Sequence, residues 1–64
     1  MKDTIDLTLW VKCEREGEAW QATVTWMRPG GAAETEGAKA TVPSNAVKFA
    51  VARLVERIWD EVAT

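Results

Sequence analysis

The side chains with catalytic or metal-binding potential in this 64-residue chain are carboxylates, one cysteine and one serine, because histidine and tyrosine are absent. Without histidine, serine–histidine and cysteine–histidine catalysis and the usual zinc ligand sets are excluded. Cys13 lies in an apolar alternation, which favours a core cysteine over a nucleophile. Ser44 precedes a segment with helical spacing, which favours a helix N-cap. The acidic residues follow neither a glycosidase nor a calcium-loop pattern, so we expect no enzyme, no cofactor and no metal. Those weighed for such patterns are Glu14, Glu16, Glu18, Glu34, Glu36, Glu56, Asp60 and Glu61.

The composition is that of one small globular domain covering residues 1–64. Hydrophobic residues make up 47% of the chain, the net charge is −2 and the pI is about 5.0. An acidic balance disfavours a strongly basic nucleic-acid binder and a polybasic membrane anchor. A lone cysteine and an N-terminus without an apolar signal region predict a cytoplasmic protein with no membrane contact. Frequent alanine, valine, glutamate and arginine hint at a bacterial or phage source.

Two segments alternate between apolar and polar residues and predict strands over about 4–15 and 18–28. A two-residue turn at Glu16-Gly17 would join them, with Gly17 at a positive φ. Paired residue numbers would then sum to 33. On the buried face this pairing sets Cys13 opposite Trp20, Val11 opposite Ala22, Leu9 opposite Val24 and Leu7 opposite Trp26. On the outer face it sets Trp10 opposite Thr23 and Thr8 opposite Thr25.

The rest of the chain predicts a loop, a short strand and a helix. Proline and glycines over 28–37 indicate a mobile loop, and the alternation over 38–42 indicates a third strand that Pro43 ends. A helix is expected over about 45–63, with Arg57 and Glu61 pairing on its solvated side. The fold class is therefore α+β, an antiparallel three-stranded sheet packed on one C-terminal helix in the order β-β-β-α. The apolar arc of that helix comprises Val47, Ala50, Val51, Leu54, Val55, Ile58 and Val62.

Four tryptophans are a heavy aromatic load for so short a chain. Trp20 and Trp26 belong to the face expected in the core, whereas Trp10 and Met27 are apolar exceptions on the outer face. Exposed apolar side chains on one surface indicate a contact site. The partner-binding candidates are Trp10, Lys12, Thr23, Thr25, Met27 and Lys39.

A chain of this length buries only ~60% of its unfolded surface, so we expect a homodimer. Edge-strand pairing and helix packing are both open routes to it. Phe49 lies about 160° around the helix from the centre of the apolar arc, at the ~100° per residue of an α-helix. Trp59 lies at the edge of that arc. The dimer-interface candidates are Phe49, Ala52, Glu56 and Trp59.

The chain also resembles the positive-cofactor-four family of single-stranded-DNA-binding transcription coactivators, over about residues 20–60 and with an indel or two. The family has a Trp-Met-x-Pro-x-Gly motif at the end of its second strand, and then a Pro-Gly-x-Lys-Gly turn before a short strand and a proline-opened helix. The resemblance implies a curved antiparallel sheet followed by one helix, and dimerisation through the helices. The family's basic strand-binding face has no close counterpart, since Glu34 and Glu36 lie near the turn. The matching residues are Trp26-Met27-Arg28-Pro29-Gly30-Gly31, then Gly37-Ala38-Lys39-Ala40, Thr41-Val42 and Pro43-Ser44.

Three functions remain open from the sequence. The first is a non-catalytic, homodimeric protein-binding module, an inhibitor or regulator of phage or bacterial type. The second is a single-strand nucleic-acid binder, in which Trp10 would stack on a base while Lys12 and Lys39 contact phosphates. The third is a purely structural subunit of an oligomer.

Overall fold

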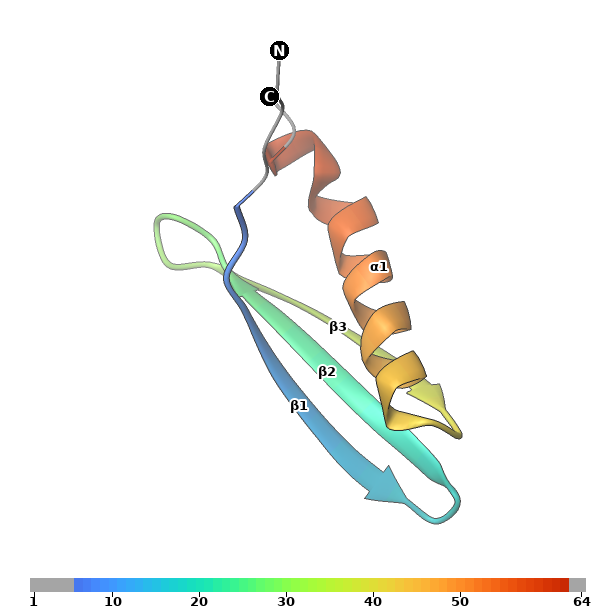
Figure 1. The fold of residues 1–64 in the computed structure, drawn as a ribbon. Coiled ribbons are helices and arrows are strands. Elements are labelled where there is room, and N and C mark those ends of the chain that lie inside the picture. The colour runs from blue at the N-terminus through green and yellow to red at the C-terminus, as the bar shows by residue number, and fades with distance from the viewer. Residues whose placement is uncertain (1–5, 63–64) are drawn as a thin grey trace.

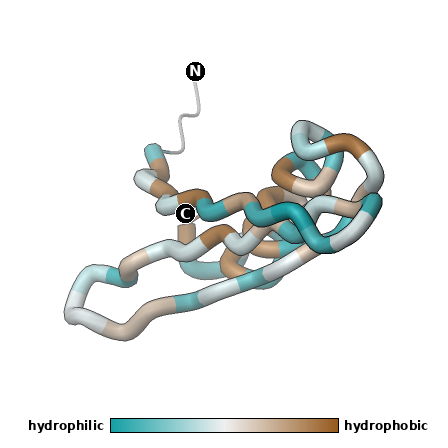
Figure 2. The backbone as a smooth tube through the Cα atoms, turned by 90° about the horizontal axis from the view of Figure 1, so that it is seen from below, coloured by the Kyte–Doolittle hydropathy of each residue, from teal (hydrophilic) through white to brown (hydrophobic). Residues whose placement is uncertain are grey.

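The computed structural model describes residues 6–62, which form a three-stranded antiparallel sheet and one helix (Figure 1). The strands are β1 (Leu9–Glu16), β2 (Ala19–Met27) and β3 (Ala33–Ala40), and the helix is α1 (Pro43–Val62). The sheet order is β1-β2-β3, so β2 is central and the other two strands are edges. This confirms the predicted β-β-β-α class. Along the strands the tube in Figure 2 alternates between hydrophilic and hydrophobic colours, as half-buried strands require.

The hairpin of β1 and β2 has a different register from the predicted one. Leu9 is opposite Trp26, Val11 opposite Val24 and Cys13 opposite Ala22, so paired numbers sum to 35 rather than 33. The predicted partners of Trp10 and Thr8 are wrong for the same reason, and Trp10 is opposite Thr25. The turn residues are Gly17 and Glu18, because Glu16 pairs with Ala19. Gly17 has φ +62° and takes the first turn position, where a type II′ turn prefers glycine. A shift of two residues keeps every side chain on its predicted face.

The predicted bounds of the first and third strands are also wrong. Residues 6–8 are not in a strand, and 4–5 lie outside the described residues. Strand β3 begins at Ala33, inside the segment predicted as a loop, and ends at Ala40 rather than at residue 42. These bounds follow from the pairing of β3 with β2, in which Met27 is opposite Ala33 and Trp20 is opposite Ala40. The connecting loop is therefore only 28–32, closed by hydrogen bonds from the Arg28 N–H to Ala32 and from the Gly31 N–H to Arg28.

The helix begins at Pro43, so Ser44 is an exposed first-turn residue and not the predicted N-cap. The carbonyl of Val42 accepts hydrogen bonds from the N–H groups of Asn45 and Ala46, at 3.1 Å each. Proline suits the first helical position because it has no N–H to satisfy there. The helix is described to Val62, and residue 63 lies outside the described residues. No helix within residues 6–62 is long and apolar enough to span a membrane.

The core lies between α1 and the inner face of β2 and β3. The buried side chains of the helix are Ala46, Ala50, Leu54 and Ile58, and the valines of the predicted arc are half-buried beside them. Trp26 is buried as predicted, whereas Trp20 is half-buried. The helix packs mainly on β2 and β3 and only marginally on β1, as Figure 1 shows. As a result Val11, predicted in the core, is 50% exposed although its partner Val24 is fully buried.

The turn at Gly17 provides a stability prediction. A Cβ at this position would meet no atom within 4 Å, so Gly17→Ala tests backbone conformation alone. An L-residue held at positive φ should cost about 1 kcal/mol of unfolding free energy. Urea denaturation at matched protein concentration measures this cost. Glu18→Ala is the control, since Glu18 does not have a positive φ, and it should change stability by less than about 0.5 kcal/mol. Equal stability of both variants would contradict the turn assignment.

Candidate interaction surfaces

The sheet face opposite α1, called here the outer face, is uncovered in the described structure. The register sets Trp10, Thr25 and Thr35 in one row across the three strands, and Lys12, Thr23 and Gly37 in the next. All six predicted partner-binding residues share this face, because each has the parity opposite to the buried side chains. They are Trp10, Lys12, Thr23, Thr25, Met27 and Lys39.

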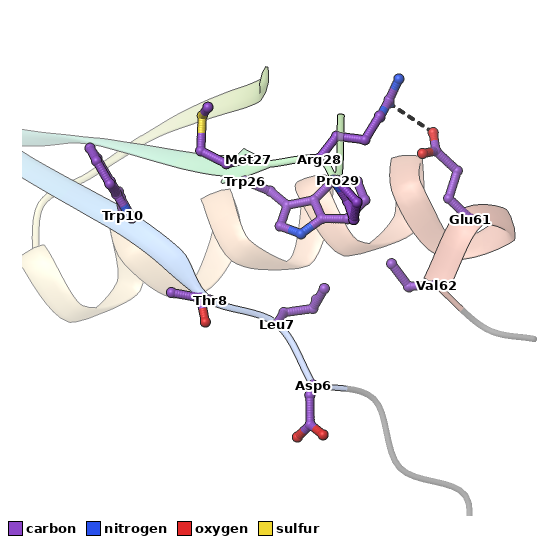
Figure 3. Close-up of a pocket in the computed structure, with 10 residues that line it drawn as sticks. All are labelled: Asp6, Leu7, Thr8, Trp10, Trp26, Met27, Arg28, Pro29, Glu61 and Val62. Carbon is purple, nitrogen blue, oxygen red and sulfur yellow. Dashed lines mark hydrogen bonds and ion pairs between the residues drawn. The ribbon is translucent and has the colours of Figure 1, made fainter. Parts of the chain in front are cut away.

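The apolar part of the outer face is concentrated at one end of the sheet. Trp10 is 68% exposed and Met27 is 49% exposed. In Figure 3 Met27 projects away from the helix, whereas Trp26 in the neighbouring position points toward it. Beside Trp10 the hydroxyls of Thr25 and Thr35 lie 3.3 Å apart, so these threonines hydrogen-bond each other. An exposed indole beside a polar, hydrogen-bonded floor is typical of a contact surface.

The charges of the outer face neutralise each other. Lys12 Nζ lies 2.8 Å from Glu14, and Lys39 Nζ lies 2.9 Å from Glu16 on the far strand. The hydrogen bond from Lys12 to Glu14 raises the pKa of this lysine above its ordinary value of 10.5, because it favours the protonated form. Both lysines predicted to contact phosphates therefore already have a carboxylate partner.

A second polar cluster, the arginine–glutamate cluster, ties α1 to β3. Arg57 donates to Glu34 at 2.6 Å, to Glu36 at 2.7 Å and to the Thr35 carbonyl at 3.0 Å. Arg28 donates to Glu34 at 2.5 Å and to Glu61 at 2.8 Å. The predicted pair of Arg57 with Glu61 is wrong, because Arg57 points toward β3 and Glu61 bonds Arg28. Glu34 and Glu36 thus have structural partners, which explains two acidic side chains on the inner face of β3.

An open hollow lies where β2 leaves the sheet, next to this cluster (Figure 3). Its floor is Trp26, with the Arg28 guanidinium carbon 5.8 Å from the centre of the ring. The Arg28 Nε is buried without a hydrogen-bond partner among the described residues. The remaining lining comes from the segment that leads into β1, from β1 itself, from the end of β2 with the following loop, and from the end of α1: Asp6, Leu7, Thr8, Trp10, Met27, Pro29, Glu61 and Val62. Both Glu34 and Glu61 hold the guanidinium of Arg28, so this arginine is not available as a free positive charge for a ligand.

The residues considered for catalysis are dispersed. Cys13 is half-buried in β1 opposite Ala22, and its thiol is free. Ser44 lies at the far end of the sheet, in the first turn of α1. Within residues 6–62 there is no group of three or more cysteine or acidic side chains that could hold a metal ion.

The four dimer-interface candidates lie on the side of α1 away from the sheet. Phe49 and Trp59 are each 48% exposed, and Ala52 and Glu56 are exposed as well. The two aromatic residues are ten positions apart, which is ~15 Å along a helix. Charged residues interrupt the surface between them, so this side of the helix has no continuous apolar stripe.

The sequence pattern does not predict the exposure of two valines. Val11 on β1 and Val42 before the helix are 50% and 46% exposed. The alternation over β1 places Val11 on the inner face, but it does not say which strands one helix can cover. Nor does the pattern predict Arg28 as the residue that contacts both Trp26 and Glu61.

The chain was compared with protein-family models, with curated proteins and with solved structures, and none of the three comparisons found a match.

The arginine–glutamate cluster provides a second prediction. Arg57→Met should lower the free energy of unfolding by about 1 kcal/mol, a modest value because the Arg57 side chain is 47% exposed. The loss should shrink in high salt, which already screens the ion pairs of the wild type. Urea denaturation at low and high salt measures both effects. Arg53→Met is the control, since among residues 6–62 Arg53 donates to the Gly37 carbonyl and to no carboxylate, so it should show no such salt dependence. Equal losses at both salt concentrations would contradict an electrostatic tether.

Proposed function

We propose that this chain is a non-catalytic, homodimeric protein-binding module, an inhibitor or regulator of phage or bacterial type. Its contact surface is the outer face of the sheet. The observation that carries the proposal is the 68% exposure of Trp10, beside the exposed Met27, on a face that no described element covers. Large exposed aromatic side chains dominate the binding energy of many protein interfaces.

The charges of the outer face favour a protein partner over a nucleic acid. Lys12 and Lys39 are matched there by Glu14 and Glu16. Binding to a phosphate backbone draws its affinity from unmatched positive charge, which this face does not offer. A protein partner needs an apolar anchor within a polar rim, and Trp10 among threonines and paired charges has this form.

The absence of catalysis is supported by the residue types and their positions. The chain has no histidine, and Cys13, Ser44 and the cluster carboxylates lie apart from one another or in ion pairs. The cytoplasm is part of the proposal because a single cysteine suits a reducing compartment.

Single-stranded nucleic-acid binding is the second candidate, favoured by the placement of Trp10, Lys12, Thr23, Thr25 and Lys39 on one face. It is also what the resemblance to the coactivator family implies. One indole could stack on one base, which contributes ~1–3 kcal/mol. Such binding would first have to separate both lysines from their glutamates.

Removal of the indole tests the role of the outer face. With immobilised wild-type protein we expect a protein from a bacterial lysate to bind, and Trp10→Ala should lose it by tenfold or more because a central aromatic anchor is gone (~1.4 kcal/mol). Trp59→Ala is the matched control, an equally sized change on the exposed side of α1 that should retain the protein. If both variants bind as the wild type does, the outer face is not the contact surface.

A titration with labelled oligo-dT distinguishes the second candidate. We expect no change in tryptophan fluorescence up to about 50 µM oligonucleotide at low salt, because the lysines of the outer face are matched by carboxylates. Binding that weakens steeply with salt and disappears in Trp10→Ala would favour the nucleic-acid function instead. Glu14→Gln with Glu16→Gln is the informative comparison, since freeing both lysines should increase any residual affinity.

A further inference from the structure

The two edges of the sheet differ in whether their outward carbonyls are occupied. On β3, Arg57 donates to the Thr35 carbonyl at 3.0 Å and Arg53 donates to the Gly37 carbonyl at 3.1 Å. Thr35 and Gly37 are alternate residues, and their carbonyls point away from β2 along the free edge. Two long charged side chains from α1 therefore cover this edge, which is a common protection against strand pairing.

The edge of β1 has no such cover in the described structure. Glu16 and Ala19 flank a two-residue turn and so form a hydrogen-bonded pair, and the pairing alternates from there. The backbone groups of Leu9, Val11, Cys13 and Arg15 consequently point outward, away from β2. No described strand pairs with this side of β1.

The inner face of β1 is apolar, and the helix covers it only in part. Val11 is 50% exposed, and its neighbours Leu9 and Cys13 are half-buried. At ~100° per residue, Val47 and Val51 lie on the flank of α1 opposite to Arg53 and Arg57, which is the flank toward β1. Both valines are half-buried and pack against the core. A further strand beside β1 would bury apolar side chains on its inner face.

We propose that a second copy of the chain pairs its β1 with this β1, antiparallel and around a two-fold axis, to form one six-stranded sheet. This inference rests on the homodimer of the proposed function and names its interface. The interface is the free edge of β1 and not the exposed side of α1; edge-strand pairing is one of the two routes that the sequence left open.

The side chains select one register. With Val11 opposite Val11 of the second copy, Leu9 faces Cys13 on the inner side and Trp10 faces Lys12 on the outer side. Every inner pair is then apolar, and each indole meets a lysine across the junction, a favourable cation–π pairing. Lys12 keeps its bond to Glu14 within its own copy.

Three other registers are worse. A shift that centres Trp10 on the axis pairs only residues 9–11 of the strand, because β1 begins at Leu9. A shift that centres Lys12 on the axis opposes two like charges directly. A shift that centres Cys13 sets Val11 opposite Arg15 and Trp10 opposite Glu16, so apolar side chains would face charged ones.

The dimer completes the proposed binding surface. The outer faces of two copies become one continuous surface, and each Trp10 stands next to Lys12 of the other copy. The surface offered to a partner protein is then twice that of one chain and has two-fold symmetry.

Sedimentation equilibrium tests the interface. The wild type should have twice the chain mass of 7.1 kDa. In Val11→Pro the dimer dissociation constant should rise tenfold or more, because each copy loses an outward N–H and gains a ring at the junction. The fold should persist, as circular dichroism will report, since the N–H of Val11 does not serve β2.

Two control variants make this result specific. Thr35→Pro makes the same change on the covered β3 edge and should leave the dimer intact. Phe49→Glu places a charge on the exposed side of α1 and should also leave it intact. Dissociation by Phe49→Glu with a stable Val11→Pro dimer would overturn the proposal in favour of helix packing. A monomeric wild type at about 100 µM would overturn it as well, while the Trp10→Ala binding assay still tests the outer face separately.

Oxidative cross-linking tests the register without relying on the proline variant. Val11→Cys in a Cys13→Ser background should form an intermolecular disulfide, because the two cysteines would be directly opposed at about 5.5 Å between Cα atoms. Lys12→Cys in the same background should not, since the register separates those positions by more than about 7 Å. Efficient cross-linking of wild-type Cys13 instead would contradict this register.

Discussion

A helix with its side chains is about 10 Å across, and neighbouring strands are about 4.8 Å apart, so one helix covers about two strands of a sheet. Residues 6–62 of this chain form three strands and one helix. One strand must therefore have an inner face with incomplete cover, wherever the helix lies. The exposure of Val11 opposite a fully buried Val24 is the direct result of this geometric limit.

Two features decide which strand remains uncovered. Alanines at the contact, namely Ala22 and Ala38 in the sheet with Ala46 and Ala50 in the helix, let α1 approach β2 and β3 closely. The ion pairs of Arg57 with Glu34 and Glu36 then hold the helix on the β3 side. Packing and charge act in the same direction, so β1 is the strand left at the side. Arg57, together with Arg53, also covers the free edge of β3, so no additional element is needed to protect this edge.

Much of this fold follows from the sequence because period-two and helical spacings are local signals. The class, the parity of β1 and β2 and the shared face of Trp10 and Met27 were all predicted correctly. The register was not, since turns at Glu16-Gly17 and Gly17-Glu18 keep the same parity and only the latter is observed. The first half of β3 was missed because Glu34 and Glu36 occupy inner positions, where their shared partner Arg57 is on the helix and more than twenty residues away. Those pairings are long-range, and so is the position of α1 that leaves Val11 exposed.

The different treatment of the two sheet edges has a consequence for the size of any assembly. If both edge strands of a sheet were uncovered, each added copy would present a further uncovered edge, and growth would continue toward a fibril. Here each copy has one open edge and one edge occupied by Arg53 and Arg57. Joining two open edges leaves only occupied ones at both ends of the sheet. In the proposed dimer, the arginines that hold the helix in place would thereby limit strand pairing to two copies and stop the backbone chemistry that drives amyloid growth.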